Sequence, residues 1–247
     1  HNVDTQDSCS MNLDRRWADS QNEGDDLSEE EIVDRIFEAV VEQRLPAGTK
    51  LSEAALCEAF GVGRMRVRRS LLLLASHEVV ELHSNRGAFI ASPTAEQAKA
   101  VFEARLAIEP AIARLAVQRA DKADVGTLKT HLDKEMAAHL AGSRHDAIRL
   151  SGQFHVMLAQ IADNNIMLRM VRELVARTSL IIGIFGAPGV SNCRDDEHTK
   201  IVAAFENRDE ALAAALMSEH LLHIQSHLDL RARRTTPVDL VQLFNPH

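Results

Sequence analysis

Four arginines lie close together in this chain, on a segment that reads as a tight turn followed by a helix. They are Arg64, Arg66, Arg68 and Arg69, and Arg86 follows beside a second turn. Residues 61–90 hold five arginines and two acids, although the whole chain carries a formal net charge of -8. Guanidinium groups bind DNA phosphates and guanine edges, so this pattern favours DNA binding over a merely solvated helix face.

Three histidines form a second group of candidates. His155, His198 and His220 each share a helical face with apolar residues, which predicts that they point into a helical interior. Neutral imidazoles that converge from three helices often bind a first-row metal ion. A lone histidine on such a face is more often a hydrogen-bonded core residue, and spacing alone leaves both interpretations open. His223 and His227 form a rival pair, whose simpler interpretation is surface exposure.

One further arginine occupies a position that an apolar residue would normally fill. Arg105 continues an apolar stripe on its helix, and Glu109 lies one turn further along. A buried guanidinium is unfavourable unless an anion meets it. That anion is either an internal carboxylate such as Glu109 or the carboxylate or phosphate of a ligand, and the residues alone favour neither. Ser151, one turn before His155, points into the same interior.

The chain begins with an acidic, polar stretch over residues 1–27, which we expect to be disordered. Most of the acidic excess lies here and in the next few residues, so the pI of about 5.8 does not argue against DNA binding. Ser28 with Glu31 fits a capping box. This box opens the first helix of a unit that we place at residues 28–92.

The arginines belong to this unit, whose pattern is helix, helix, turn, helix and hairpin. Gly61 supplies the tight turn, and Gly63 is a weaker helix cap than serine would be. Short strands at 81–83 and 88–90 surround a second turn, in which Gly87 tolerates a positive φ. The order of elements predicts a winged helix-turn-helix with a small β-hairpin wing.

Residues 93–232 are predicted to be helical almost throughout. Thr94 with Gln97 forms another capping box at their start. We expect helices near 95–120, 122–141, 145–162, 165–184, 194–207 and 209–231. The fold class is therefore mainly α: an amino-terminal winged helix-turn-helix, then an all-α helical bundle. Residues 233–247 are expected to form a tail with little structure of its own.

Bulk properties narrow the classes of protein further. The three cysteines, Cys9, Cys57 and Cys193, are far apart, which suggests neither a disulfide framework nor a cysteine metal site. No apolar run approaches the roughly 20 residues that span a bilayer. The amino terminus has no basic-then-apolar signal pattern. We expect a cytoplasmic protein without a membrane partner.

The amino-terminal motifs resemble the GntR superfamily of bacterial transcription regulators, and the whole arrangement resembles its FadR subfamily. In that family the turn and recognition helix usually read GVSRTPVREAL, and the wing ends in RGAFV. This chain has GVGRMRVRRSL at 61–71 and NRGAFI at 85–90. The resemblance implies that Arg64 and Arg68 contact DNA, together with Arg86 and Gly87 of the wing.

Some positions of the arginine helix depart from the family pattern. Gly63, Met65, Arg66 and Arg69 replace the usual Ser, Thr, Pro and Glu. The loss of serine removes a hydroxyl that could cap the helix or bind phosphate. Arg66 and Arg69 add positive charge, so we include both among the DNA-binding candidates.

The second half resembles the FCD ligand-binding domain of the same subfamily. RLAIEPAIARLAV at 105–117, FHVMLAQIADN at 154–164 and EHTKIVAAFENRDEALAAALMSEH at 197–220 match its segments in order. The resemblance implies a metal shell of Asp-x-x-x-His plus two later histidines, which are His155, His198 and His220 here. Ser151 stands where the Asp would be, and a neutral serine is a poor ligand for a divalent ion. Zinc or nickel is the expected metal, and the alternative is a metal-free pocket in which the histidines bind the effector directly.

These observations predict a ligand-responsive transcription regulator, a repressor that binds palindromic operator DNA as a homodimer. A small carboxylate effector is expected in the helical bundle, where Arg105, Glu109 and Ser151 would contact it beside the histidines. Two other classes remain. One is a metal-dependent enzyme whose three histidines activate water, and the other is a DNA-binding protein whose helical bundle only dimerises.

Overall fold

The computed structural model describes residues 27–186, 196–231 and 238–244. The amino-terminal unit contains α1 (Glu29–Val41), β1 (Lys50–Leu51), α2 (Glu53–Phe60), α3 (Arg64–Ser76), β2 (Val80–His83) and β3 (Gly87–Ile90). The second unit contains α4 (Ala95–Arg119), α5 (Lys122–Leu140), α6 (Arg144–Ile161), α7 (Asn165–Phe185), α8 (Glu197–Glu206) and α9 (Glu210–Ser226). A last short helix, α10 (Leu240–Phe244), follows. The predicted fold class, mainly α with a winged helix-turn-helix and a helical bundle, is confirmed.

The helix-turn-helix forms for local reasons that the sequence already contains. Gly61 ends α2 with φ of 65°, a left-handed conformation that glycine adopts without strain. Gly63 precedes α3 and gives it no side-chain cap, as expected after the loss of serine. Leu56, Val62, Val67 and Leu71 are buried as predicted. Ala59 is only half buried, because the larger Phe60 beside it takes the buried position.

The wing is a three-stranded antiparallel sheet with the order β1-β3-β2. Strands β2 and β3 form the predicted hairpin, in which Val80 pairs with Ile90 and His83 with Gly87. Gly87 has φ of 94°, so the expected positive φ is confirmed. The sequence did not predict β1, because its two residues are too few to show an alternating pattern.

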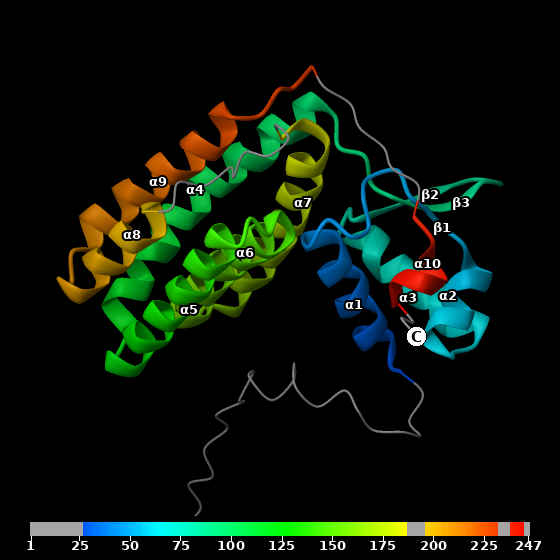
Figure 1. Cartoon of the computed structure of the whole chain (residues 1–247), viewed down its shortest axis with the longest axis horizontal. Helices are drawn as coiled ribbons and strands as arrows, with labels where there is room; N and C mark the ends of the chain where they lie inside the picture. The colour runs from blue at the N-terminus through cyan, green and yellow to red at the C-terminus, as the bar shows by residue number, and fades with distance from the viewer. Residues whose placement is uncertain (1–26, 187–195, 232–237, 245–247) are drawn as a thin grey trace, which may run out of the picture.

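The helical unit is a bundle in which α6 contacts α4, α5 and α7. Helices α4 and α9 lie side by side along the bundle, and α8 packs against α9 (Figure 1). The predicted helices agree with these elements to within a few residues, except that α9 ends at Ser226 and the predicted start of the 194–207 helix lies outside the described residues. This arrangement makes α6 the central element of the bundle.

The two units share buried residues rather than meeting at a polar surface. A continuous cluster joins Ile36 and Val67 of the amino-terminal unit to Phe102 of α4 and Leu180 of α7. The helical unit has a second cluster of its own, centred on residues such as Phe154. The boundary near residue 93 separates the two units along the chain, but their buried side chains pack against each other across it.

Within the predicted tail of residues 233–247, which we expected to have little structure of its own, the described residues 238–244 include the short helix α10. Helix α10 packs against α2 of the amino-terminal unit (Figure 1). Leu240 is 5% exposed, and the ring centroids of Phe244 and Phe60 are 4.8 Å apart. The contact joins segments distant in sequence, which no local pattern reveals.

Crossing a bilayer requires a long, apolar helix, and none of the helices described here has that combination of length and composition.

Candidate functional sites

The exposed face of the amino-terminal unit carries the predicted DNA-binding residues Arg64, Arg68, Arg86 and Gly87. Arg64 begins α3, directly after the turn. The Nε atom of Arg68 lies 3.0 Å from each carboxylate oxygen of Glu53 on α2. This exposed ion pair contributes little to stability, but it restricts the direction of the guanidinium.

The other two arginines of α3 are tied to the start of α1. The Nη1 atom of Arg66 donates to the carbonyl oxygen of Leu27 at 3.0 Å. The Nη1 atom of Arg69 lies 3.2 Å from Oε1 of Glu29, and the hydroxyl of Ser70 donates to the Glu29 carbonyl. Arg66 and Arg69 therefore have a structural role in holding α3 against α1. Their contact with DNA stays a prediction.

On the wing, the side chain of Arg86 lies over an aromatic ring. Its guanidinium carbon is 5.6 Å from the ring centroid of Phe89, which is a cation–π distance. At Gly87 a Cβ atom would meet nothing within 4 Å, so the positive φ is the reason for glycine here. The wing thus presents an oriented cation beside a turn with an open surface.

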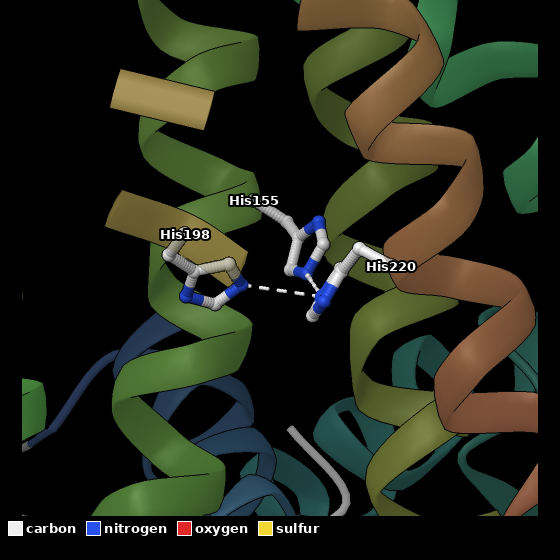
Figure 2. A group of neighbouring side chains, drawn as sticks. All are labelled: His155, His198 and His220. Atoms are coloured by element: carbon white, nitrogen blue, oxygen red, sulfur yellow. Dashed lines mark hydrogen bonds between the residues drawn. The ribbon is translucent and has the colours of Figure 1, made fainter. Parts of the chain in front are cut away.

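Within the helical unit, the three predicted histidines converge. His155 comes from α6, His198 from α8 and His220 from α9, and they are 2%, 3% and 1% exposed. The Nε2 atom of His220 lies 3.2 Å from Nε2 of His155 and 3.2 Å from Nε2 of His198. Figure 2 shows the three rings pointing toward one another. The spatial grouping that the spacing left open is therefore present.

A carboxylate lies behind each imidazole. The Nδ1 atom of His155 is 2.5 Å from Oε2 of Glu109. The Nδ1 atom of His198 is 2.8 Å from Oε2 of Glu135, and Nδ1 of His220 is 2.8 Å from Oε2 of Glu197. An imidazole that donates its Nδ1 proton to a carboxylate presents a lone pair at Nε2. All three lone pairs are then directed toward a common centre.

The protonation states suit this arrangement. Burial lowers the pKa of His155 to about 3, so its ring is neutral near pH 7. Burial also opposes the ionisation of Glu109, but Arg105 and His155 outweigh it and hold the pKa of Glu109 well below its ordinary value. In the same way, His198 and His131 overcome burial and lower the pKa of Glu135 to about 2.

Arg105 forms an internal ion pair with Glu109, which was one of the two interpretations of its predicted buried position. Its Nε atom lies 2.5 Å from Oε1 of Glu109, and its Nη2 atom lies 3.3 Å from Oε2. The remaining Nη1 donates to the hydroxyl of Thr178 at 3.2 Å, and both Arg105 and Glu109 are 2% exposed. Glu109 thus bridges the guanidinium and the imidazole of His155.

A cavity of about 190 Å³ adjoins His155, one of the three clustered histidines. Its lining includes Arg105, Ser151, His155 and Thr178, with apolar side chains such as Ile182. Glu109 is not part of this lining, since it lies behind His155. Of the three predicted effector contacts, Arg105 and Ser151 border the cavity and Glu109 orients its neighbours.

Two of the three distances between the Nε2 atoms suit a divalent metal ion, and the three ligand atoms lie within 4.8 Å of one another. Two ligand atoms bound to one ion at about 2.0–2.1 Å, at angles between about 90° and 109°, lie about 2.8–3.4 Å apart. The Nε2 distances of 3.2 Å fall in this range. Three carboxylates, those of Glu109, Glu135 and Glu197, lie behind the imidazoles, and Arg105 pairs with Glu109, so a divalent cation would find compensating negative charge here.

Sequence reasoning missed Glu135 and Glu197. Glu135 lies one helical turn after the buried His131, and an acid at a buried helical position was the only available signal. Glu197 directly precedes His198 yet pairs with His220 and with Nδ1 of His223, at 2.8 Å in each case. The rival pair His223 and His227 therefore lies beside the cluster and does not belong to it.

Comparison with known proteins identifies the family of both units. The profile of the bacterial regulatory proteins of the gntR family matches residues 28–90, and the FCD domain profile matches residues 100–223. The HTH-type transcriptional repressor RspR of Escherichia coli (strain K12) is 26% identical over 186 residues, which are 75% of this chain and 82% of that protein. The HTH-type transcriptional regulator LutR of Bacillus subtilis (strain 168) is 26% identical over 206 residues, covering 74% of this chain and 93% of its own.

Two solved structures share the fold. The Escherichia coli McbR/YncC protein superposes with a TM-score of 0.72 at 17% identity, covering 80% of this chain and 95% of that one. A GntR regulator from Rhodococcus sp. RHA1 described as putative gives a TM-score of 0.70 at 21% identity, covering 83% and 99%. The family consists of transcription regulators, and some FCD domains bind metal. The chain belongs to the GntR family of bacterial transcription regulators, with an FCD domain in its second half, an arrangement consistent with the FadR subfamily.

Proposed function

We propose that this regulator is a repressor that acts as a homodimer and responds to a small organic acid through a zinc or nickel ion. His155, His198 and His220 would hold the ion, and the cavity beside them would receive the acid. The convergence of three buried Nε2 atoms on one centre, each with a carboxylate behind its ring, carries this proposal. Carboxylates placed in this way hold the rings in the orientation that binds metal.

Electrostatics explains why the acid would need the metal. Arg105 is already paired with Glu109, and Glu135 and Glu197 add further negative charge nearby. An anion entering such a region would be repelled. A bound divalent ion supplies positive charge and open coordination positions for a carboxylate oxygen. Ser151 borders the cavity in place of a charged ligand, and this leaves more of the ion's charge for the effector.

The winged units would bind two half-sites of a palindromic operator. Arg64 and Arg68 on α3 would enter the major groove, while Arg86 and Gly87 would place the wing against the DNA backbone. Arg66 and Arg69 would add to the positive potential at the edge of this surface. A homodimer matches a palindrome because both have twofold symmetry.

The test uses full-length protein stripped of metal with a chelator. Metal content after reloading with Zn²⁺ or Ni²⁺ is measured by mass spectrometry, and melting is followed with and without a panel of small carboxylates. We expect one ion per chain and carboxylate-dependent stabilisation only in the loaded protein. His155→Ala should lose both responses, whereas His227→Ala, outside the cluster, should keep them. Carboxylate binding of equal strength in stripped and loaded protein would contradict the proposal.

A further inference from the structure

The end of α1 is held by polar contacts to both helices that flank the cavity. The side-chain amide of Gln43 donates from Nε2 to the carbonyl oxygen of Ser179 on α7, at 3.1 Å. The Nδ1 atom of His145 on α6 lies 2.5 Å from the carbonyl oxygen of Glu42. The Nε atom of Arg149, one turn further along α6, lies 3.3 Å from Oε1 of Glu42. The turn Glu42–Gln43 therefore connects the DNA-binding unit to α6 and α7 together.

The backbone at this turn is held in an uncommon conformation. Gln43 has φ of 57°, in the left-handed region that a residue other than glycine or asparagine rarely adopts. Such a conformation persists where surrounding contacts determine it. The backbone of the turn is closed locally, by the N–H of Gln43 to the Val40 carbonyl and the N–H of Leu45 to the Ala39 carbonyl, both at 2.9 Å, and the side-chain amide of Gln43 adds the contact across the boundary.

The same parts of α6 and α7 line the cavity. Ser179 itself belongs to the lining, and its neighbour Thr178 bonds to Arg105. On α6, the lining residues Ile148 and Ser151 lie beside Arg149 in sequence. A change in the cavity that shifts either helix would therefore act on groups one or two residues away from the contacts with the turn.

The wall between the cavity and α1 is thin. Gly152 and Val175 line the cavity and also a larger cleft of about 720 Å³, whose opposite side includes Phe37 and Val41 of α1. A Cβ atom at Gly152 would lie 2.7 Å from Cγ1 of Val175, which shows how closely α6 and α7 approach there. A displacement of this wall would consequently reach α1 directly.

We infer that the turn Glu42–Gln43 transmits occupancy of the histidine cavity to the DNA-binding unit. The inference rests on the proposed function, since it requires that the cavity be filled in one state and not in another. Helix α1 packs on α3, and the Ser70 hydroxyl of α3 donates to the Glu29 carbonyl. Movement of α1 therefore moves the arginine helix, and Gln43 is the positioning residue of this connection.

Two substitutions distinguish the loss of the side-chain contact between Gln43 and Ser179 from a change in the backbone of the turn. Gln43→Asn keeps a residue that tolerates the left-handed conformation, but its amide is one methylene too short to reach Ser179. Gln43→Glu keeps the length and replaces the donor with an acceptor facing the Ser179 carbonyl oxygen. Asp34→Asn is the matched control, because Asp34 also pairs across the boundary, with Nη2 of Arg172 at 3.3 Å, and neither residue lines the cavity.

The experiment is hydrogen exchange of the full chain, stripped of metal and then titrated with Zn²⁺ alone, with zinc affinity measured in parallel. In the wild type, zinc should change exchange rates both in α6 and α9 and in residues 53–76 of the DNA-binding unit, by at least about fivefold. Both Gln43 variants should bind zinc with unchanged affinity and show the change in α6 and α9, but lose it in residues 53–76. Asp34→Asn should behave as the wild type.

The outcomes distinguish the two proposals. If the Gln43 variants keep the full response in residues 53–76, the turn is not the transmitter, and the metal site stands. If zinc changes only the helical unit of the wild type, the inference also fails while the metal site stands. If the wild type binds no zinc, the metal site fails and the transmitting role of Gln43 fails with it, and if it binds zinc without a change in either unit, the inference fails while the metal site stands.

Discussion

At the scale of single residues, the carboxylates behind the histidines decide what the cluster can bind. Oε2 of Glu135 lies 2.8 Å from Nδ1 of His198, and Oε1 of the same carboxylate lies 3.3 Å from Nε2 of His131. The carboxylate thereby fixes which nitrogen of His198 carries the proton. A histidine cluster without such partners would place its ring protons at Nε2 part of the time, where they would oppose a cation.

The first prediction concerns this residue. Glu135→Gln should lower zinc affinity by roughly 10–100-fold, because a neutral amide is a weaker acceptor for the Nδ1 proton of His198. Competition with a chromophoric chelator measures the affinity. The matched control is Glu206→Gln, which removes an exposed pair with Lys129 and should leave zinc affinity unchanged. Equal affinity of Glu135→Gln and the wild type would exclude a role for Glu135 in the site.

The second prediction compares two helical glycines. Alanine normally stabilises a helix interior by about 0.5–1 kcal/mol relative to glycine. Gly126→Ala in α5 should show this gain, because its Cβ would meet nothing within 4 Å. Gly152→Ala in α6 should instead destabilise the protein by about 1–3 kcal/mol, since its Cβ would lie 2.7 Å from Cγ1 of Val175. Urea unfolding measures both, and the two changes should have opposite signs.

At the scale of elements, α3 carries two kinds of arginine. Arg68 pairs with Glu53 of α2, whereas Arg66 and Arg69 reach back to the start of α1. The sequence showed only four cations on one helix. It did not show that Leu27 and Glu29 would lie beside two of them, because that contact depends on how α1 crosses α3.

The third prediction follows from this division. On a duplex selected from a random pool, Arg64→Ala and Arg68→Ala should each lose about 1–3 kcal/mol of binding free energy and relax base preference, if they read base edges. Arg69→Ala should weaken binding less and to a similar extent on all sequences, because Glu29 holds its guanidinium toward α1, where it would add only to the general positive potential. Anisotropy titrations at several salt concentrations measure these effects. Wild-type affinity in both Arg64→Ala and Arg68→Ala would remove α3 as the DNA-binding helix.

The elements that could be predicted from sequence are those with local determinants. Ser28 and Thr94 both form the predicted capping boxes, and Gly61 and Gly87 adopt the predicted positive φ. These interactions join residues at most three positions apart, so a single sequence contains them. The three histidines were predictable as inward-facing residues because helical spacing sets the face on which each residue lies.

The missing parts of the site join residues distant in sequence. His198 and Glu135 are 63 residues apart, and His220 and Glu197 are 23 residues apart. Their pairing depends on the rotation and height of α5, α8 and α9 within the bundle, which periodicity leaves undetermined. The sequence predicted Arg105 and Ser151 as effector contacts, and both border the cavity, but its remaining walls could not be predicted because they come from several helices.

At the scale of the whole molecule, the carboxy-terminal helix α10 packs against α2 of the amino-terminal unit. The cluster of buried residues that begins in α1 and α3 continues into α4 and α7, and Leu240 of α10 belongs to it as well. The two units are therefore joined by the passage from β3 to α4, by the contacts of α1 and by the return of α10 to α2. The DNA-binding unit is consequently stabilised by parts of the chain on both sides of the helical bundle.

The fourth prediction tests the return of α10. Leu240→Ala should lower the free energy of unfolding by about 2–3 kcal/mol, because it removes a buried side chain and leaves a cavity against α2. Leu140→Ala, at the end of α5, is the control with the same chemistry at a side chain that is 83% exposed, and it should change stability by less than about 0.5 kcal/mol. Urea unfolding followed by circular dichroism compares the two. If the two variants unfold at the same urea concentration, α10 does not stabilise the DNA-binding unit, and the carboxy terminus is the independent tail that the sequence alone suggested.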